Sequence, residues 1–174
     1  MSTLKLIQDV ALRRALGDRC FSKVTLAINI AGAATIKTTS AAILSVDGVF
    51  GSAVALAAQS MAVTHGLNGA PVSAGPTAYV QPVSTAVFYV IAQNLAGAVA
   101  VIQGGFNGQV VTMPTGISFT SQGEMPAVPV GFAPIGYVRV ATNASTTFTP
   151  GVTILDAAGV TATYVDVTIL PSAI

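Results

Sequence analysis

Charged side chains are scarce in this chain. Only 7% of its 174 residues are Asp, Glu, Lys or Arg, whereas ordinary domains carry roughly 25%. None of these residues occurs between Asp47 and Glu124. This stretch does not read as a membrane span, because Gly, Pro, Asn, Gln, Ser and Thr interrupt it every few residues. A surface this neutral predicts that other subunits cover much of it, which favours a structural or assembly role.

Cysteine and histidine each occur once, which limits the chemistry available. Because Cys20 is the one cysteine, no disulfide can form within the chain. Synthesis in a reducing compartment such as a cytoplasm is therefore expected. The absence of an N-terminal signal pattern agrees with that expectation. The neighbouring cations could lower the pKa of Cys20, but a small residue buried in the core or at an interface is the favoured interpretation.

The sequence contains few residues that could form a catalytic or metal site. His65 would need a nucleophile and an orienting carboxylate to converge on it, so a loop or interface histidine is the favoured interpretation. No zinc or calcium spacing exists. An acid/base pair formed by Asp156 and Asp166 through folding stays open, although turn and strand roles are the default. We therefore assign no catalytic, cofactor-binding or metal-binding residue and expect no enzyme and no cofactor.

The distribution of charge also bears on partners. The formal net charge is +1, so no overall field attracts nucleic acid. Five basic and two acidic residues precede Thr25, which leaves the N-terminal segment at +3. The strongest candidate for a membrane span, residues 86–102, has Gln93, Asn94 and Gly97 at its centre and is better explained as a hairpin. We expect neither a nucleic-acid nor a membrane partner.

Residues 1–22 are predicted to form an N-terminal helical arm, and residues 23–174 a β domain. Residues 4–16 have a helical pattern that Gly17 ends. Their apolar side chains point in several directions rather than along one stripe. The arm is therefore expected to dock against a neighbouring subunit or another protein, or equally to cap one end of its own sheet.

From Lys23 onward the apolar pattern has a period of two, which is typical of strands. Three tetrapeptides begin with Asn or Asp and end with Gly, as type I hairpin turns prefer. They occupy residues 29–32, 94–97 and 156–159. The predicted hairpins pair residues 23–30 with 33–38, residues 85–93 with 98–103, and residues 152–155 with 160–169.

The predicted strands differ in exposure. Residues 85–93 are apolar on both faces and should be covered on both, whereas residues 136–142 and 163–169 alternate and should be half-solvated. In the last of these, Val165 lies on the apolar side and Tyr164 on the other. The prolines of residues 125–134 predict an extended surface connector. The predicted fold is all-β, a jelly-roll-like β-sandwich or barrel of short antiparallel strands.

Several segments of the chain share a distinctive pattern of strands and turns. They are Thr35-Ile36-Lys37-Thr38-Thr39 with residues 44–49, the hairpin 88–104, residues 125–131 and 134–140, and residues 148–151 with 156–161. In these segments the sequence resembles small head-decoration, cement or head-fibre proteins of tailed bacteriophages. The resemblance covers most of residues 35–165 and concerns pattern and turns rather than catalytic residues.

This resemblance implies a virion structural protein that self-associates, as a homotrimer, on the outside of a capsid. Its expected partners are its own copies and the major capsid protein or another virion protein. Its expected location is the virion, after synthesis in the host cytoplasm. One alternative is a trimeric fibre or lectin-like module that binds a host receptor or glycan through loop aromatics, for which Tyr79 and Phe106 are the candidates. A membrane-active protein and an enzyme are more remote alternatives.

Overall fold

The computed structural model describes residues 17–72, 79–105, 108–113, 116–119 and 125–168. Within these ranges the chain forms twelve strands and no α-helix, so the predicted all-β class is confirmed. The predicted helix of residues 4–16 lies outside the described residues. Arg19–Cys20, inside the segment assigned to the arm, form the first strand.

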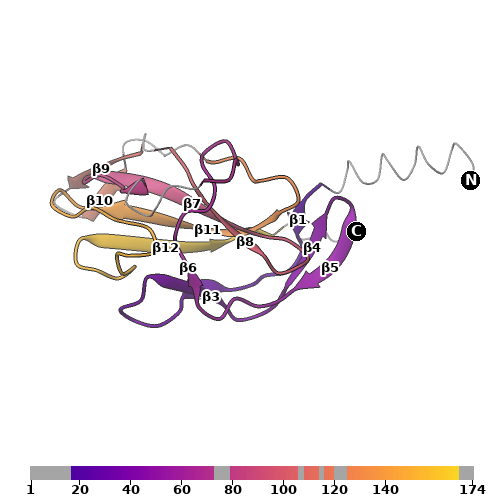
Figure 1. The fold of residues 1–174 in the computed structure, drawn as a ribbon. Coiled ribbons are helices and arrows are strands. Elements are labelled where there is room, and N and C mark those ends of the chain that lie inside the picture. The colour runs from indigo at the N-terminus through magenta and orange to yellow at the C-terminus, as the bar shows by residue number, and fades with distance from the viewer. Residues whose placement is uncertain (1–16, 73–78, 106–107, 114–115, 120–124, 169–174) are drawn as a thin grey trace, which may run out of the picture.

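The strands pair antiparallel and form three sheets (Figure 1). One sheet has the order β1-β4-β5, another β2-β3-β6, and a six-stranded sheet has the order β10-β9-β7-β11-β12 with β8 also paired to β7. The bounds are β1 Arg19–Cys20, β2 Leu26–Ile28, β3 Thr35–Thr38, β4 Ala42–Val46, β5 Val49–Ala53, β6 Gln59–Ser60, β7 Thr85–Gln93, β8 Val99–Gln103, β9 Gly108–Met113, β10 Gly116–Phe119, β11 Ala133–Thr142 and β12 Val160–Asp166.

Strand β7 is the centre of the large sheet. It pairs with β11 along one edge and with β8 and β9 along the other. Its residues after Thr85 are all buried, which confirms the prediction that both faces are covered. Tyr89 and Ile91 face the main core, whereas Val90 belongs to a second cluster on the opposite face, against which Val128 and Phe132 pack.

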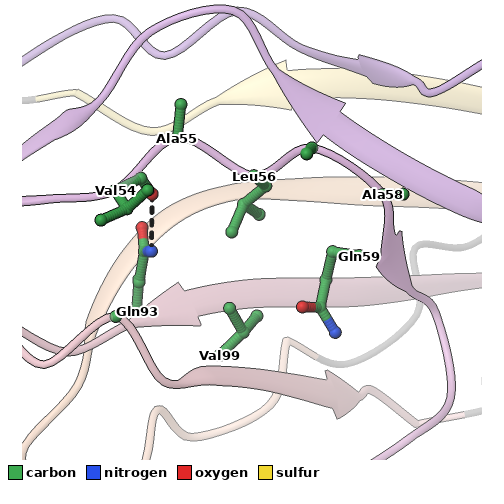
Figure 2. Close-up of a pocket in the computed structure, with 9 residues that line it drawn as sticks. Val54, Ala55, Leu56, Ala58, Gln59, Gln93 and Val99 are labelled. Atoms are coloured by element: carbon green, nitrogen blue, oxygen red, sulfur yellow. Dashed lines mark hydrogen bonds between the residues drawn. The ribbon is translucent and has the colours of Figure 1, made fainter.

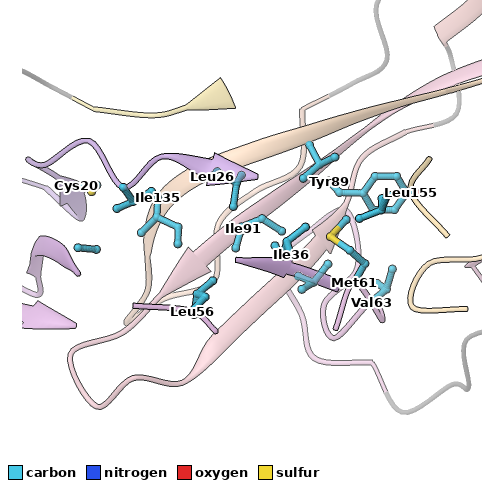
Figure 3. Close-up of a cluster of buried hydrophobic side chains, with 14 of the residues drawn as sticks. Cys20, Leu26, Ile36, Leu56, Met61, Val63, Tyr89, Ile91, Ile135 and Leu155 are labelled. Atoms are coloured by element: carbon cyan, nitrogen blue, oxygen red, sulfur yellow. The ribbon is translucent and has the colours of Figure 1, made fainter. Parts of the chain in front are cut away.

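The main hydrophobic core joins all three sheets (Figure 3). Leu44 of β4, Ile36 of β3 and Tyr89 of β7 are completely buried in it. Met61 and Leu155 join them from segments between strands. Since each sheet contributes one apolar face to a shared interior, none of the three buries its apolar side chains by itself.

Two of the three predicted hairpins are confirmed. β2 pairs with β3, and β7 pairs with β8. In the β7–β8 turn the amide of Gly97 donates to the carbonyl of Asn94, and the Asn94 side chain accepts the amide of Ala98 at 2.8 Å. Gly32 and Gly97 have φ values of 75° and 86°, which only glycine adopts without a steric penalty.

The third predicted hairpin is wrong. Residues 152–155 form no strand, and β12 pairs instead with β11. The reason is a tertiary contact: the amide of Leu155 donates to the carbonyl of Ala33 at 3.0 Å, which holds this segment against the β2–β3 turn. The turn itself is present, since Gly159 has a φ of 85°.

The alternation in β11 is as predicted, because Val138 and Val140 are buried while Tyr137 and Arg139 are partly exposed. In β12 the expected sides are reversed. Tyr164 packs against the main core, and Val165, on the other face, lies outside the core cluster. The segment predicted as a connector, residues 125–134, contains no strand from Met125 to Phe132, whereas Ala133 and Pro134 already belong to β11.

Candidate interaction surface

The sheet β1-β4-β5 has an apolar outer face. Register places Cys20, Leu44 and Gly51 together on the inner face. The rows on either side of these residues face outward and hold Ile43, which pairs with Ser52, and Phe50, which pairs with Ser45. Ile43 and Phe50 are 50% and 56% exposed. Phe21 follows β1 on the same side, and its ring centroid lies 5.3 Å from that of Phe50. The three side chains form a continuous apolar surface at one end of the molecule, where Figure 1 shows β4 and β5.

A buried hydroxyl lies within this surface. Ser45 faces outward in register with Arg19 and Phe50, yet it is fully buried and its Oγ has no hydrogen-bond partner. Burying an unpaired hydroxyl costs about 1–3 kcal/mol. The side chains around Ser45 therefore exclude water from its hydroxyl, even though Ser45 lies on the outer face of the sheet.

A groove of about 220 Å³ lies beside the segment that follows β5 (Figure 2). Residues 54–59 form one side of the groove, and Gln93, Gly97 and Val99 form the other. The side-chain amide of Gln93 donates from Nε2 to the carbonyl of Val54 at 2.9 Å across the groove. The Val54 side chain is 74% exposed. No charged residue lines the groove, so it suits an apolar or neutral polar partner.

These surface residues were not singled out by the sequence patterns. One sequence signal for this surface was available in β4. Ile43 and Leu44 are both apolar, although they lie on opposite faces of the strand. Apolar residues on both faces of a strand indicate that both are covered, as in β7. In β4 the outer face is covered at Ser45 and open at Ile43.

His65, Cys20, Asp156 and Asp166, the titratable residues considered above, each have a structural role of their own. The ring Nδ1 of His65 lies 2.9 Å from Thr64 Oγ1, and its edge packs against Phe132 with ring centroids 5.9 Å apart. Burial lowers the pKa of His65, so the neutral ring is favoured. It lies between strands, in bridges to Pro71 and Ile102, which agrees with its interpretation as a loop histidine.

Cys20 is a buried core residue, as the favoured interpretation had it. Its thiol donates to the carbonyl of Ser22 at 3.2 Å, and the side chain is 2% exposed. Burial raises the pKa of this thiol. The hypothesis that neighbouring cations lower it is therefore wrong, because desolvation of the thiolate is the larger effect.

The two aspartates have separate hydrogen-bond partners. The carboxylate of Asp156 accepts the amide of Gly32 at 2.9 and 3.1 Å. That of Asp166 accepts the amides of Thr25 and Leu26 at 3.2 and 2.8 Å. Each carboxylate thus fastens a segment more than a hundred residues away in sequence.

Other site types find no support in the described part of the chain. There, no three His, Cys, Asp or Glu side chains are close enough to hold a metal ion. No helix among the same residues has the length and hydropathy of a membrane span. Tyr79, one of the two candidate loop aromatics, is partly buried against the main core, and Phe106 lies outside the described residues.

Comparison of the chain with protein-family models, with curated proteins and with solved structures finds no match.

Proposed function

We propose that this chain is a non-enzymatic structural protein of a virus particle, which decorates or cements the capsid of a tailed bacteriophage. The observation that supports this proposal is the apolar surface formed by Phe21, Ile43, Phe50 and Val54. A standard interface of about 1,600 Å² gains about 40 kcal/mol gross from burial before association costs are subtracted. Repetition over a capsid multiplies such contacts.

The proposal includes a finer architecture and a set of partners. The three sheets would form a jelly-roll-like sandwich, and the part of residues 1–22 that precedes β1 would anchor it as a helical arm. The partners would be copies of the chain, as a homotrimer, and the major capsid protein or another virion protein. The chain would need no cofactor and would reach the virion from the host cytoplasm.

Particle association tests this function directly. The tagged chain is produced together with the virus that encodes it, and the particles are purified and assayed for the tag. We expect wild-type chain to co-purify with particles and Val54→Glu to be depleted, because a carboxylate at a buried interface loses its hydration. The matched control is Ala144→Glu, at an exposed position in the turn after β11, which should bind like wild type. Particles free of wild-type chain contradict the proposal.

The alternative of a receptor-binding or glycan-binding fibre rests on exposed loop aromatics. Tyr79 does not supply one, because it is partly buried against the core. We therefore keep the capsid-decorating function as the proposal.

A further inference from the structure

Strand β5 ends its sheet, and one of its edges is free among the described residues. The amide of Phe21 donates to the carbonyl of Ile43 at 2.8 Å, and the amide of Ile43 donates to Ser22 Oγ. The backbone groups of Ile43 therefore point toward β1. Because backbone groups alternate between the two edges of a strand, those of Leu44 point toward β5, where Leu44 pairs with Gly51.

The alternation continues in β5 itself. Gly51 directs its N–H and C=O toward β4, so Phe50 and Ser52 direct theirs toward the free edge. No described residue forms a backbone hydrogen bond with either of them there. Both side chains are exposed on the outer face, and no described strand pairs with this edge.

Free edges of natural sheets are normally protected by Lys, Pro, a bulge or a covering loop. β5 has the sequence Val-Phe-Gly-Ser-Ala and contains neither Lys nor Pro. Its pairing with β4 runs without a register shift over the whole strand. An unprotected, regular and apolar edge is the kind of surface that adds a further strand.

We propose that a second copy of this chain pairs antiparallel with β5, with Gly51 of both copies at a two-fold axis. This inference rests on the proposed function, because it assigns one of the self-contacts. Centred on Gly51, the pairing sets Phe50 opposite Ser52 of the second copy and Ser52 opposite its Phe50. These are the residues whose backbone groups face outward, so each pair exchanges both of its N–H···O bonds.

Charge and shape favour a second copy over another occupant. A two-fold contact brings identical surfaces together, and directly opposed like charges destabilise strand pairs. β5 carries no charge, so pairing with itself has no such cost. On the inner face Leu95 lies over Gly51, 2.8 Å from where a Cβ would be. The two-fold axis therefore brings Leu95 of both copies toward each other as an apolar contact.

Crosslinking tests the register. Phe50→Cys and Ser52→Cys chains are produced separately, mixed and oxidised. Opposed residues of a hydrogen-bonded pair have Cα atoms about 5.5 Å apart, within disulfide range, whereas residues 50 and 50 of the two copies are diagonal neighbours beyond it. We expect a covalent dimer from the mixture and little from either variant alone. Native Cys20 is buried, and mixing Ala144→Cys with Ser52→Cys controls for random collision. Failure of the mixture to crosslink above that control overturns the inference.

Mass in solution tests the contact independently, by light scattering at micromolar concentration. We expect wild type to contain an even number of chains, since a two-fold contact also joins trimers in pairs. Ser52→Lys should halve that mass, and Ala144→Lys should leave it unchanged. An odd-numbered wild-type assembly, or a Ser52→Lys mass equal to wild type, overturns the inference.

The two proposals fail in different ways. A Ser52→Lys chain that still binds particles after its mass has halved leaves the capsid function intact. If the cysteine variants crosslink through β5 while the wild-type chain never joins particles, the two-fold contact is supported and the capsid function is removed. Should Ser52→Lys not fold, the cysteine mixture alone decides the matter.

Discussion

The hydroxyl of Tyr89 holds together a buried polar network. It donates to Gln81 Oε1 at 3.2 Å and accepts from Gln103 Nε2 at 3.1 Å. Gln81 is fixed in place, because its Nε2 donates to the carbonyls of Val140 and Thr85 at 3.0 and 3.1 Å. Tyr89 and Gln81 are completely buried, and burial raises the pKa of the Tyr89 phenol, so the hydroxyl stays protonated.

Tyr89→Phe isolates one hydrogen-bonding effect. The change opens no large cavity, but it leaves Gln81 Oε1 buried without its donor, and the Gln81 amide cannot turn without losing its two backbone acceptors. An unsatisfied buried group costs about 1–3 kcal/mol, and we expect the free energy of unfolding to fall by that amount. The matched control is Tyr137→Phe. The Tyr137 hydroxyl forms no hydrogen bond with any described residue, and this change should stay within about 0.5 kcal/mol of wild type.

Urea unfolding followed by circular dichroism measures both variants. The protein concentration must be equal in all samples, because association stabilises the folded state by mass action. The slope against urea should stay constant, so that the shift in midpoint reports stability alone. A loss for Tyr89→Phe no larger than that for Tyr137→Phe would refute the reasoning, because the buried network would then contribute nothing measurable.

Three further predictions concern turns and titratable groups. Gly97→Ala should cost about 1–2 kcal/mol for its left-handed backbone. Gly151→Ala should cost more in the same urea assay, because its added Cβ would lie 2.7 Å from the amide nitrogen of Ala62. Equal losses of unfolding free energy in Gly97→Ala and Gly151→Ala would contradict this expectation. Burial raises the pKa of Tyr164 from 10.0 to about 12, so its contribution to stability is present below pH 10 and lost as the pH rises toward 12. Tyr164→Phe should flatten this decline in pH-dependent melting. Burial also raises the pKa of Cys20, so a thiol reagent at mildly alkaline pH should label it only on unfolding, and rapid labelling of folded protein would contradict its placement.

Turns were the most predictable local feature of this protein. Glycine adopts positive φ without a steric penalty whatever surrounds it, and Gly32, Gly97 and Gly159 all have positive φ. Pairing was predictable only where the two strands flank one short turn, as in β7–β8. It failed for residues 152–155, because Leu155 is held by Ala33, a residue far away in sequence that no local pattern can reveal.

The existence of the candidate surface was predictable from the sequence, but its position was not. The scarcity of charge indicated that part of the surface is covered, without indicating which part. Phe50 and Tyr164 are both aromatic residues in strands, yet Phe50 is exposed and Tyr164 packs against the core. Two-residue alternation separates the faces of a strand, and it does not say which face meets another sheet.

The sequence by itself determined the all-β class, the turn positions and the neutrality of the chain, since these depend on local backbone preferences and on composition. The tertiary structure alone decided that three sheets share one core, that Asp156 and Asp166 bind segments distant in sequence, and that β5 lies at the end of its sheet. Those outcomes depend on which strands are neighbours, and that choice is made by packing over the whole chain.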